Sequence, residues 1–186
     1  MDSKKYNMLT FPNLSKKTLV VTVHNEEQKK FLHKKTHLVD FASVELKELR
    51  RAVRDMRFIV KTAKGIGLSA NQVGIDLKFF VAEVPVEGGG KPKFYAIFNP
   101  QLVHDKEIQE LEEGCLSVPG VTGLVERSKK VVLSGFDVQG KPIRIKAWGL
   151  LAHIFQHEVD HLNGHLFIDK AKKIYEEVKD ANEDES

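Results

Sequence analysis

The sequence is poor in cysteine, and it lacks long apolar runs. Cys115 is the only cysteine among 186 residues, so no intramolecular disulfide can form and a reducing compartment suits the chain. No stretch approaches the roughly 18 apolar residues of a membrane span. The first residues, Met1-Asp2-Ser3-Lys4-Lys5-Tyr6, lack the apolar segment of a signal peptide. We therefore expect a cytoplasmic protein with no membrane partner.

A strong charge imbalance is also missing. The formal net charge of +3 is small for this length and gives only a weak indication of acidic partners. No pattern typical of a nucleic-acid module is present, so we expect no direct sequence-specific nucleic-acid binding. The composition, 41% hydrophobic and 30% charged, is that of a globular protein. Residues 1–186 fit one domain that is long enough to bury a core.

Histidine, in contrast, recurs at a regular spacing near the C-terminus, at His153, His157, His161 and His165. Residues four apart lie on one face of a helix, so such a pair can bind one metal ion. Only the pair His157 and His161 encloses a glutamate directly after its first histidine. Glu158 is therefore placed to take a proton from a water molecule at the metal. We expect His153 and His165 to be ordinary hydrogen-bonded histidines.

A solvated helix face could carry the same motif. The apolar residues that precede it, however, predict a largely buried helix, in which imidazoles need partners. These residues are Leu150, Leu151, Ile154 and Phe155.

Two loop segments also contain chemically active residues. Residues 65–74 include three glycines, which permit positive φ angles or close approach of a ligand, but the spacing is not that of a phosphate loop. A plain turn would explain the glycines but not Gln72, whose amide can donate to an oxyanion. Cys115 lies between Gly114 and Pro119 in a second loop. Its thiolate is a candidate third metal ligand, and the neighbouring backbone N–H groups can meet a substrate oxygen; the alternative is a small buried hydrophobe.

Periodicity predicts the remaining elements. We expect an amphipathic helix with its N-cap at Ser43 and its end near Lys64, and a second helix that starts directly after Gly149. A short basic helix is expected over 171–178. Strands are expected at 78–84, 94–98, 101–103 and 125–136, the last pairing with 142–148 across a turn.

Three motifs, taken in order, closely resemble peptide deformylase: residues 65–72, 113–117 and 156–164. The resemblance covers roughly residues 36–169, with a divergent N-terminal extension at 1–35 and a C-terminal tail at 170–186. It implies an α+β fold in which mixed or antiparallel sheets pack around a central metal-binding helix. It also implies a metal-dependent hydrolase that removes the N-formyl group from the formylmethionine of newly synthesised polypeptides and releases formate.

The resemblance implies a role for each matching residue. The implied metal ligands are Cys115, His157 and His161, and the implied general base is Glu158. The implied oxyanion donors are Gln72 and the N–H of Leu116, and Gly67 is implied to contact the substrate through its backbone. An ion pair between Glu113 and Arg127 is expected beside the ligands. Ser69 departs from the family pattern, which usually has alanine there, and so does His153.

The ligand types alone suit zinc, whereas the family implies one divalent ion, Fe(II) in preference to Zn, Ni or Co. The expected partners are nascent N-formylmethionyl polypeptides and the ribosome, the latter through the basic tail. Two alternatives stay open. A zincin-type metallopeptidase shares the His-Glu-x-x-His motif, and a non-catalytic structural zinc module needs four closed ligands. Release of formate from a formylated Met peptide would distinguish a peptide deformylase from both alternatives.

Overall fold

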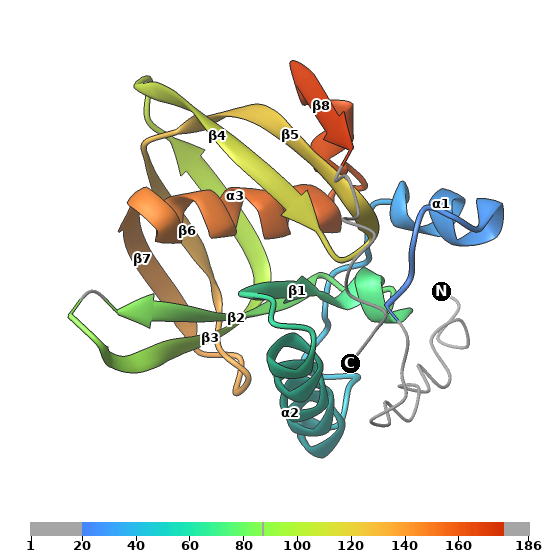
Figure 1. Cartoon of the computed structure of the whole chain (residues 1–186). Helices are drawn as coiled ribbons and strands as arrows, with labels where there is room; N and C mark the ends of the chain where they lie inside the picture. The colour runs from blue at the N-terminus through green and yellow to red at the C-terminus, as the bar shows by residue number, and fades with distance from the viewer. Residues whose placement is uncertain (1–19, 87, 177–186) are drawn as a thin grey trace.

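The computed structural model describes residues 20–86 and 88–176, which form two antiparallel sheets with a helix between them (Figure 1). The helices are α1 (Glu26–Leu32), α2 (Leu46–Thr62) and α3 (Gly149–Leu162), with short 3-10 helices η1 (Ala70–Val73) and η2 (Phe167–Asp169). The strands are β1 (Gly67–Ser69), β2 (Phe79–Val86), β3 (Gly90–His104), β4 (Ile108–Cys115), β5 (Val118–Ser128), β6 (Lys130–Phe136), β7 (Pro142–Trp148) and β8 (Lys173–Glu176).

The larger sheet has the order β1-β2-β3-β6-β7, and the smaller has the order β4-β5-β8. The strands expected at 94–98 and 101–103 are both part of β3, which bends between them. Asn99 has a φ of 49° at the bend, and the pairing with β6 shifts register between Phe98 and Gln101. The stretch 125–136 belongs to β5 and β6, which lie in different sheets. Its second half pairs with β7, as expected.

The central helix α3 begins at Gly149, one residue earlier than expected, and lies between the two sheets, as the family resemblance implies (Figure 1). Its apolar face packs on the larger sheet: the Phe155 ring lies 5.8 Å from the Phe80 ring and 5.5 Å from the Tyr95 ring. Gly164 has a φ of +80°, the left-handed conformation that follows many helix ends. Burial of this face against the sheet fixes the direction in which the histidines of α3 point.

Helix α2 covers the end of the larger sheet beside β1 and β2, but it starts later than expected. Ser43 is not its N-cap. The hydroxyl of Ser43 donates to the Asp40 carboxylate in the preceding turn, and Glu45 takes the N-cap position without a capping hydrogen bond. The helix is anchored to β2 by an ion pair between Arg57 and Glu83, with 2.6 Å between nitrogen and oxygen.

The expected basic helix at 171–178 is wrong over its described part. Residues 173–176 form β8, which pairs antiparallel with β5. A strand is favoured because Gly123 of β5 lets the tail approach closely: a Cβ there would lie 2.9 Å from the Lys173 carbonyl oxygen. No helix within the described ranges is long and apolar enough to cross a bilayer.

Helix α1 was not predicted, although Asn25 caps it and two glutamates follow. The segment before α1 runs extended beside the rest of the fold. The Val21 N–H donates to the Gln72 carbonyl, and the Val23 N–H donates to the Ser117 carbonyl. The first part of the described chain is therefore attached to the two segments, 65–74 and the one around Cys115, in which the sequence predicts functional residues.

Candidate metal centre

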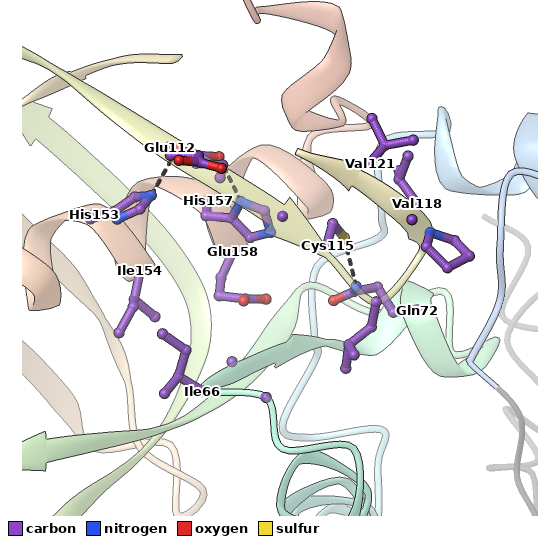
Figure 2. Close-up of a pocket in the computed structure, with 17 residues that line it drawn as sticks. Ile66, Gln72, Glu112, Cys115, Val118, Val121, His153, Ile154, His157 and Glu158 are labelled. Atoms are coloured by element: carbon purple, nitrogen blue, oxygen red, sulfur yellow. Dashed lines mark hydrogen bonds and ion pairs between the residues drawn. The ribbon is translucent and has the colours of Figure 1, made fainter. Parts of the chain in front are cut away.

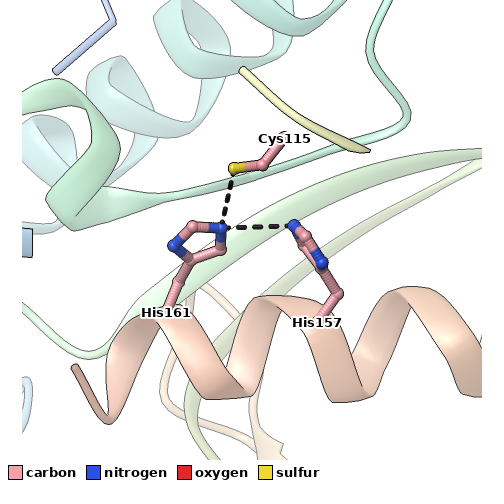
Figure 3. A group of neighbouring side chains, drawn as sticks. All are labelled: Cys115, His157 and His161. Atoms are coloured by element: carbon pink, nitrogen blue, oxygen red, sulfur yellow. Dashed lines mark hydrogen bonds between the residues drawn. The ribbon is translucent and has the colours of Figure 1, made fainter. Parts of the chain in front are cut away.

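Three ligand atoms from two distant parts of the chain converge beside α3 (Figure 3). The His161 Nε2 lies 3.1 Å from the Cys115 Sγ and 3.2 Å from the His157 Nε2. Both histidines project from the same face of α3, as their spacing requires, and Cys115 reaches them from the end of β4. All three ligand atoms lie within 4.8 Å of one another.

The chemistry and spacing of these donors fit one divalent metal ion. Metal–nitrogen distances of about 2.0–2.1 Å and metal–sulfur distances of about 2.3 Å place two tetrahedral ligands roughly 3.4–3.6 Å apart. The observed separations of 3.1 and 3.2 Å are slightly shorter. A set of three protein ligands leaves a coordination position open, which is the pattern of catalytic rather than structural sites.

Glu113 holds the first histidine in place. Its carboxylate accepts from His157 Nδ1 at 2.8 Å and from His153 Nε2 at 2.9 Å, and it forms a two-bond ion pair with Arg127. Arg127 also donates to Asp160 on α3. A carboxylate on Nδ1 sets the tautomer that leaves Nε2 free to bind a metal. The Glu113–Arg127 ion pair was expected from the sequence, whereas the contacts to His153 and Asp160 were missed.

The electrostatics of the site favour a charged thiolate. Burial raises the pKa of Cys115, but the charge of His161 and the hydrogen bonds from both histidines lower this pKa well below its usual value. For His157, burial disfavours the charged imidazolium and so lowers the pKa, yet hydrogen bonds to Cys115 and Glu113 raise this pKa to about 10. Without a metal, the negative charge of the Cys115 thiolate is therefore offset by the positive charge of the His157 imidazolium. A divalent cation would replace the proton in this balance.

Glu158 follows the first histidine and is 3% exposed, with its carboxylate turned into the pocket toward Gln72 and Cys115 (Figure 2). Burial raises its pKa above the ordinary glutamate value. The Ser69 Oγ donates to Glu158 Oε2 at 2.7 Å. Gly67 lies against the other oxygen, since a Cβ at this position would come within 2.2 Å of Oε1. The carboxylate thus fits only because residue 67 has no side chain.

Gln72 comes from η1 and is oriented by its neighbour. Its Oε1 accepts the Ser69 N–H at 2.8 Å, which turns the Nε2 end toward Cys115 Sγ at 3.4 Å and Ser117 Oγ at 3.1 Å. Leu116 occupies the tight turn between β4 and β5. Within residues 20–86 and 88–176 its N–H has no recorded acceptor. Two polar donors therefore lie close to the ligand atoms without being ligands themselves.

One pocket of about 370 Å³ joins these groups (Figure 2). It is walled by β1, by the turn between β4 and β5, and by α3, and it includes all the predicted site residues except His161. Ile66 and Ile154 line its apolar end beside His153. His153 is a hydrogen-bonded helix histidine, as expected. His165 is exposed in the loop after α3, outside this pocket.

Comparison with known proteins gives a consistent family. A model of the family described as polypeptide deformylase matches residues 18–177. The peptide deformylase of Halothermothrix orenii is 47% identical over 116 residues, 62% of this chain and 73% of that protein. That of Elusimicrobium minutum is 39% identical over 153 residues, 80% of this chain and 86% of that protein.

Solved structures agree. The crystal structure of the enzyme from Thermotoga maritima superposes with a TM-score of 0.72 at 32% identity, covering 83% of this chain and 97% of that one. A Synechococcus elongatus peptide deformylase in complex with actinonin gives 0.73 at 33% identity, covering 90% and 83%.

Proposed function

Because the chain belongs to the peptide deformylase family and removes the N-formyl group from nascent polypeptides, we propose that Cys115, His157 and His161 hold its metal ion. Support comes from the convergence of one sulfur and two nitrogen atoms in a single cluster. When bound, the divalent ion supplies Lewis acidity, which makes water a stronger nucleophile at neutral pH. Glu113 would fix the His157 ring, since its carboxylate lies on the nitrogen that faces away from the cluster.

Glu158 is the general base in this proposal. Its carboxylate takes a proton from the attacking water and later gives it to the leaving amine, since one group serves both halves of the hydrolysis. Its raised pKa suits this exchange near neutral pH. Gln72 Nε2 and the Leu116 N–H donate to the negative oxygen that forms on the formyl carbon. Loss of one such donor costs roughly 3–4 kcal/mol of barrier.

Gly67 is proposed to contact the substrate backbone. Within residues 20–86 and 88–176, β1 lies at the end of its sheet and pairs with β2 alone, so a peptide strand could be added at its other edge. The same edge borders the pocket that contains Glu158 and Gln72. A peptide bound along it would present its first residue to the ligand cluster.

The single observation that carries these roles is the placement of Glu158 and Gln72 in one pocket with the sulfur and nitrogen cluster. The test is an assay on a formylated and an unformylated Met peptide. We expect formate from the first peptide and no reaction with the second. Cleavage inside either peptide would support a zincin-type peptidase, and inertness of the metal-loaded protein would support a structural zinc module.

We further propose that the working metal is Fe(II). Two imidazoles and a thiolate suit zinc by ligand type but do not exclude iron, and metal selectivity in the cell reflects availability as well as affinity. Protein purified without air and loaded with iron should be the most active form, should decay in air, and should keep most of its activity with nickel. Zinc-loaded protein should be stable but slower. A zinc form that is fastest, with no effect of air on any form, would contradict the iron assignment.

The cellular setting is likewise a proposal. We propose that the chain acts in the cytoplasm as a single catalytic domain over 1–186, including the divergent residues 1–35, and that it meets its substrates at the ribosome. Among the tail lysines, Lys170 and Lys172 already pair with carboxylates, which leaves Lys173 as the described candidate for a ribosome contact. Co-sedimentation with ribosomes at low salt should weaken for Lys173→Glu. Equal co-sedimentation of the parent protein and the variant would contradict a contact through this residue.

A further inference from the structure

Ser69 is a fully buried serine whose hydroxyl touches the proposed base at two points. Its Oγ lies 2.7 Å from Glu158 Oε2 and 2.9 Å from the Glu158 carbonyl oxygen, across 89 positions of sequence. A hydroxyl has one proton to donate. An ionised carboxylate is the stronger acceptor, so the proton is directed to Oε2 while Glu158 is charged.

The two oxygens of Glu158 consequently have different surroundings. Oε2 is held by Ser69, whereas no hydrogen bond reaches Oε1 from any residue within 20–86 or 88–176. Oε1 lies against Gly67, in the space that a Cβ of residue 67 would fill. Gly67 and Glu158 both line the pocket. The structure therefore separates a fixed oxygen from an oxygen that is free to exchange a proton with the pocket.

We propose that Ser69 is a positioning residue that holds Oε2 of Glu158 and so assigns the proton transfers to Oε1. This inference rests on the proposed role of Glu158 as general base. Water loses a proton to Oε1 as its oxygen bonds to the formyl carbon. The same proton passes from Oε1 to the amine nitrogen as the C–N bond breaks, and the product leaves as formic acid, which gives its remaining proton to solvent and becomes formate. Ser69 keeps its own proton throughout.

Removal of the Ser69 hydroxyl deletes both of its contacts with Glu158 but keeps the hydrogen bond that orients the Gln72 side chain. The bond that orients Gln72 comes from the Ser69 backbone N–H, which an alanine retains. Ser69→Ala deletes one atom and preserves the extended backbone of β1, so the variant should fold and bind metal. The charged groups facing Glu158 are His157 and His161 on α3 and Cys115 on β4, and all three stay in place.

The test compares Ser69→Ala with Ser128→Ala, another buried serine, which bonds to the Asp105 carbonyl and has no contact with Glu158. Both are assayed with a formylated Met peptide at matched metal content. We expect Ser69→Ala to lower kcat by about tenfold with KM near the parent value, because a hydrogen bond to a charged group has been lost. Ser128→Ala should change neither quantity.

Two outcomes would overturn the inference. Ser69→Ala with the kcat of the parent would show that the hydroxyl has no positioning role. A drop in metal content and thermal midpoint that accounts for the whole loss would show a structural role instead. Glu158→Ala separates this failure from failure of the proposed function. If Glu158→Ala is inactive while Ser69→Ala is normal, only the role of Ser69 fails; if Glu158→Ala keeps its activity, the general-base assignment fails.

Discussion

At the scale of single residues, the site depends on contacts that admit little change of size. Glu158 is confined between the Ser69 hydroxyl and the bare Cα of Gly67, and His157 is confined between Glu113 and the ligand cluster. Each of these side chains is at least mostly buried. Because buried polar groups need their partners, removal of one partner should change the chemistry of the site and also cost about 1–3 kcal/mol of stability.

Glu158→Ala should lower kcat by about 10²–10⁴-fold, the usual contribution of a general base, while metal content stays near the parent value. The reason is that the Glu158 carboxylate lies beside the proposed ligands Cys115, His157 and His161 and is not one of them. Metal content by elemental analysis and formate release check the two halves of the prediction. His157→Ala is the matched control and should lose metal. Stoichiometric metal loss from Glu158→Ala would mean that the residue is a ligand.

Gly67→Ala should lower kcat by about 100-fold, since a new Cβ would force the Glu158 carboxylate away from its present position by an ångström or more. Steady-state kinetics with a formylated peptide measures the effect. Gly90→Ala serves as the control, because the nearest atom to a Cβ there is 3.6 Å away. Equal kinetics for both alanine variants would contradict the tight fit at residue 67.

At the scale of elements, ion pairs join the helices to the sheets. Arg127 of β5 bridges Glu113 of β4 and Asp160 of α3, so the buried Arg127 guanidinium links the smaller sheet to α3. Arg57 of α2 plays a similar part with Glu83 of β2, and its guanidinium also stacks over Phe94 at 4.3 Å. These links fix α2 against β2, and they fix α3 against β4 and β5, which border the pocket.

Glu83→Gln should lower stability at neutral pH and have no effect in acid. The hydrogen bond from Arg57 lowers the pKa of Glu83 in the folded state. A depressed pKa means that the ion pair stabilises the fold above the unfolded pKa, and that this stability is lost as the pH falls through the folded pKa. The half-exposed pair should contribute about 1 kcal/mol or less, or roughly 2–4 °C in Tm.

Urea unfolding at a series of pH values measures this difference. The exposed pair Glu45–Lys47 supplies the control, and Glu45→Gln should change stability little at any pH. A Glu83→Gln effect that persists unchanged in acid would rule out the ion pair as its cause.

At the scale of the whole molecule, the two sheets contribute different parts of the site. The larger sheet ends in β1 and η1, which supply Gly67, Ser69 and Gln72, while the smaller sheet supplies Glu113 and Cys115. Helix α3 lies between the sheets and completes the arrangement (Figure 1). Strand β8 closes the outer edge of the smaller sheet, and β5 leads from there into the pocket wall at Val118 and Val121.

Truncation after Lys172 should therefore destabilise the protein, whereas truncation after Glu176, which keeps β8, should not. The first variant loses the four-residue pairing with β5. Its Tm should fall by about 2–4 °C for each kcal/mol of lost pairing, and kcat/KM should fall because the pocket wall loosens. Thermal unfolding and peptide kinetics on both variants test this. Identical behaviour of the two truncated proteins would show that β8 does not support the site.

The sequence by itself determined the local parts of this arrangement. A four-residue spacing places His157 and His161 on one face of a helix, and an apolar run makes that helix central. The glycines at 65 and 67 and the segment around Cys115 indicate loops that approach a ligand. Family resemblance then supplies the fold and the reaction, both of which the structure and the comparisons confirm. The helix, its pair of histidines and the two glycine-containing segments depend on neighbours within about ten residues, where spacing and backbone geometry are sufficient.

Only the tertiary structure decided which distant side chains meet. Ser69 and Glu158 are 89 positions apart, and His153 and Glu113 are 40 apart. Residues 173–176 pair as a strand because Gly123 leaves room beside β5, although their local charge pattern had predicted a helix. Ser43, the expected N-cap of α2, donates its hydroxyl to the Asp40 carboxylate instead, and Glu45 takes the N-cap position. Local propensity is weak, at most about 1 kcal/mol per ordinary residue, so packing and buried hydrogen bonds across the fold outweigh it.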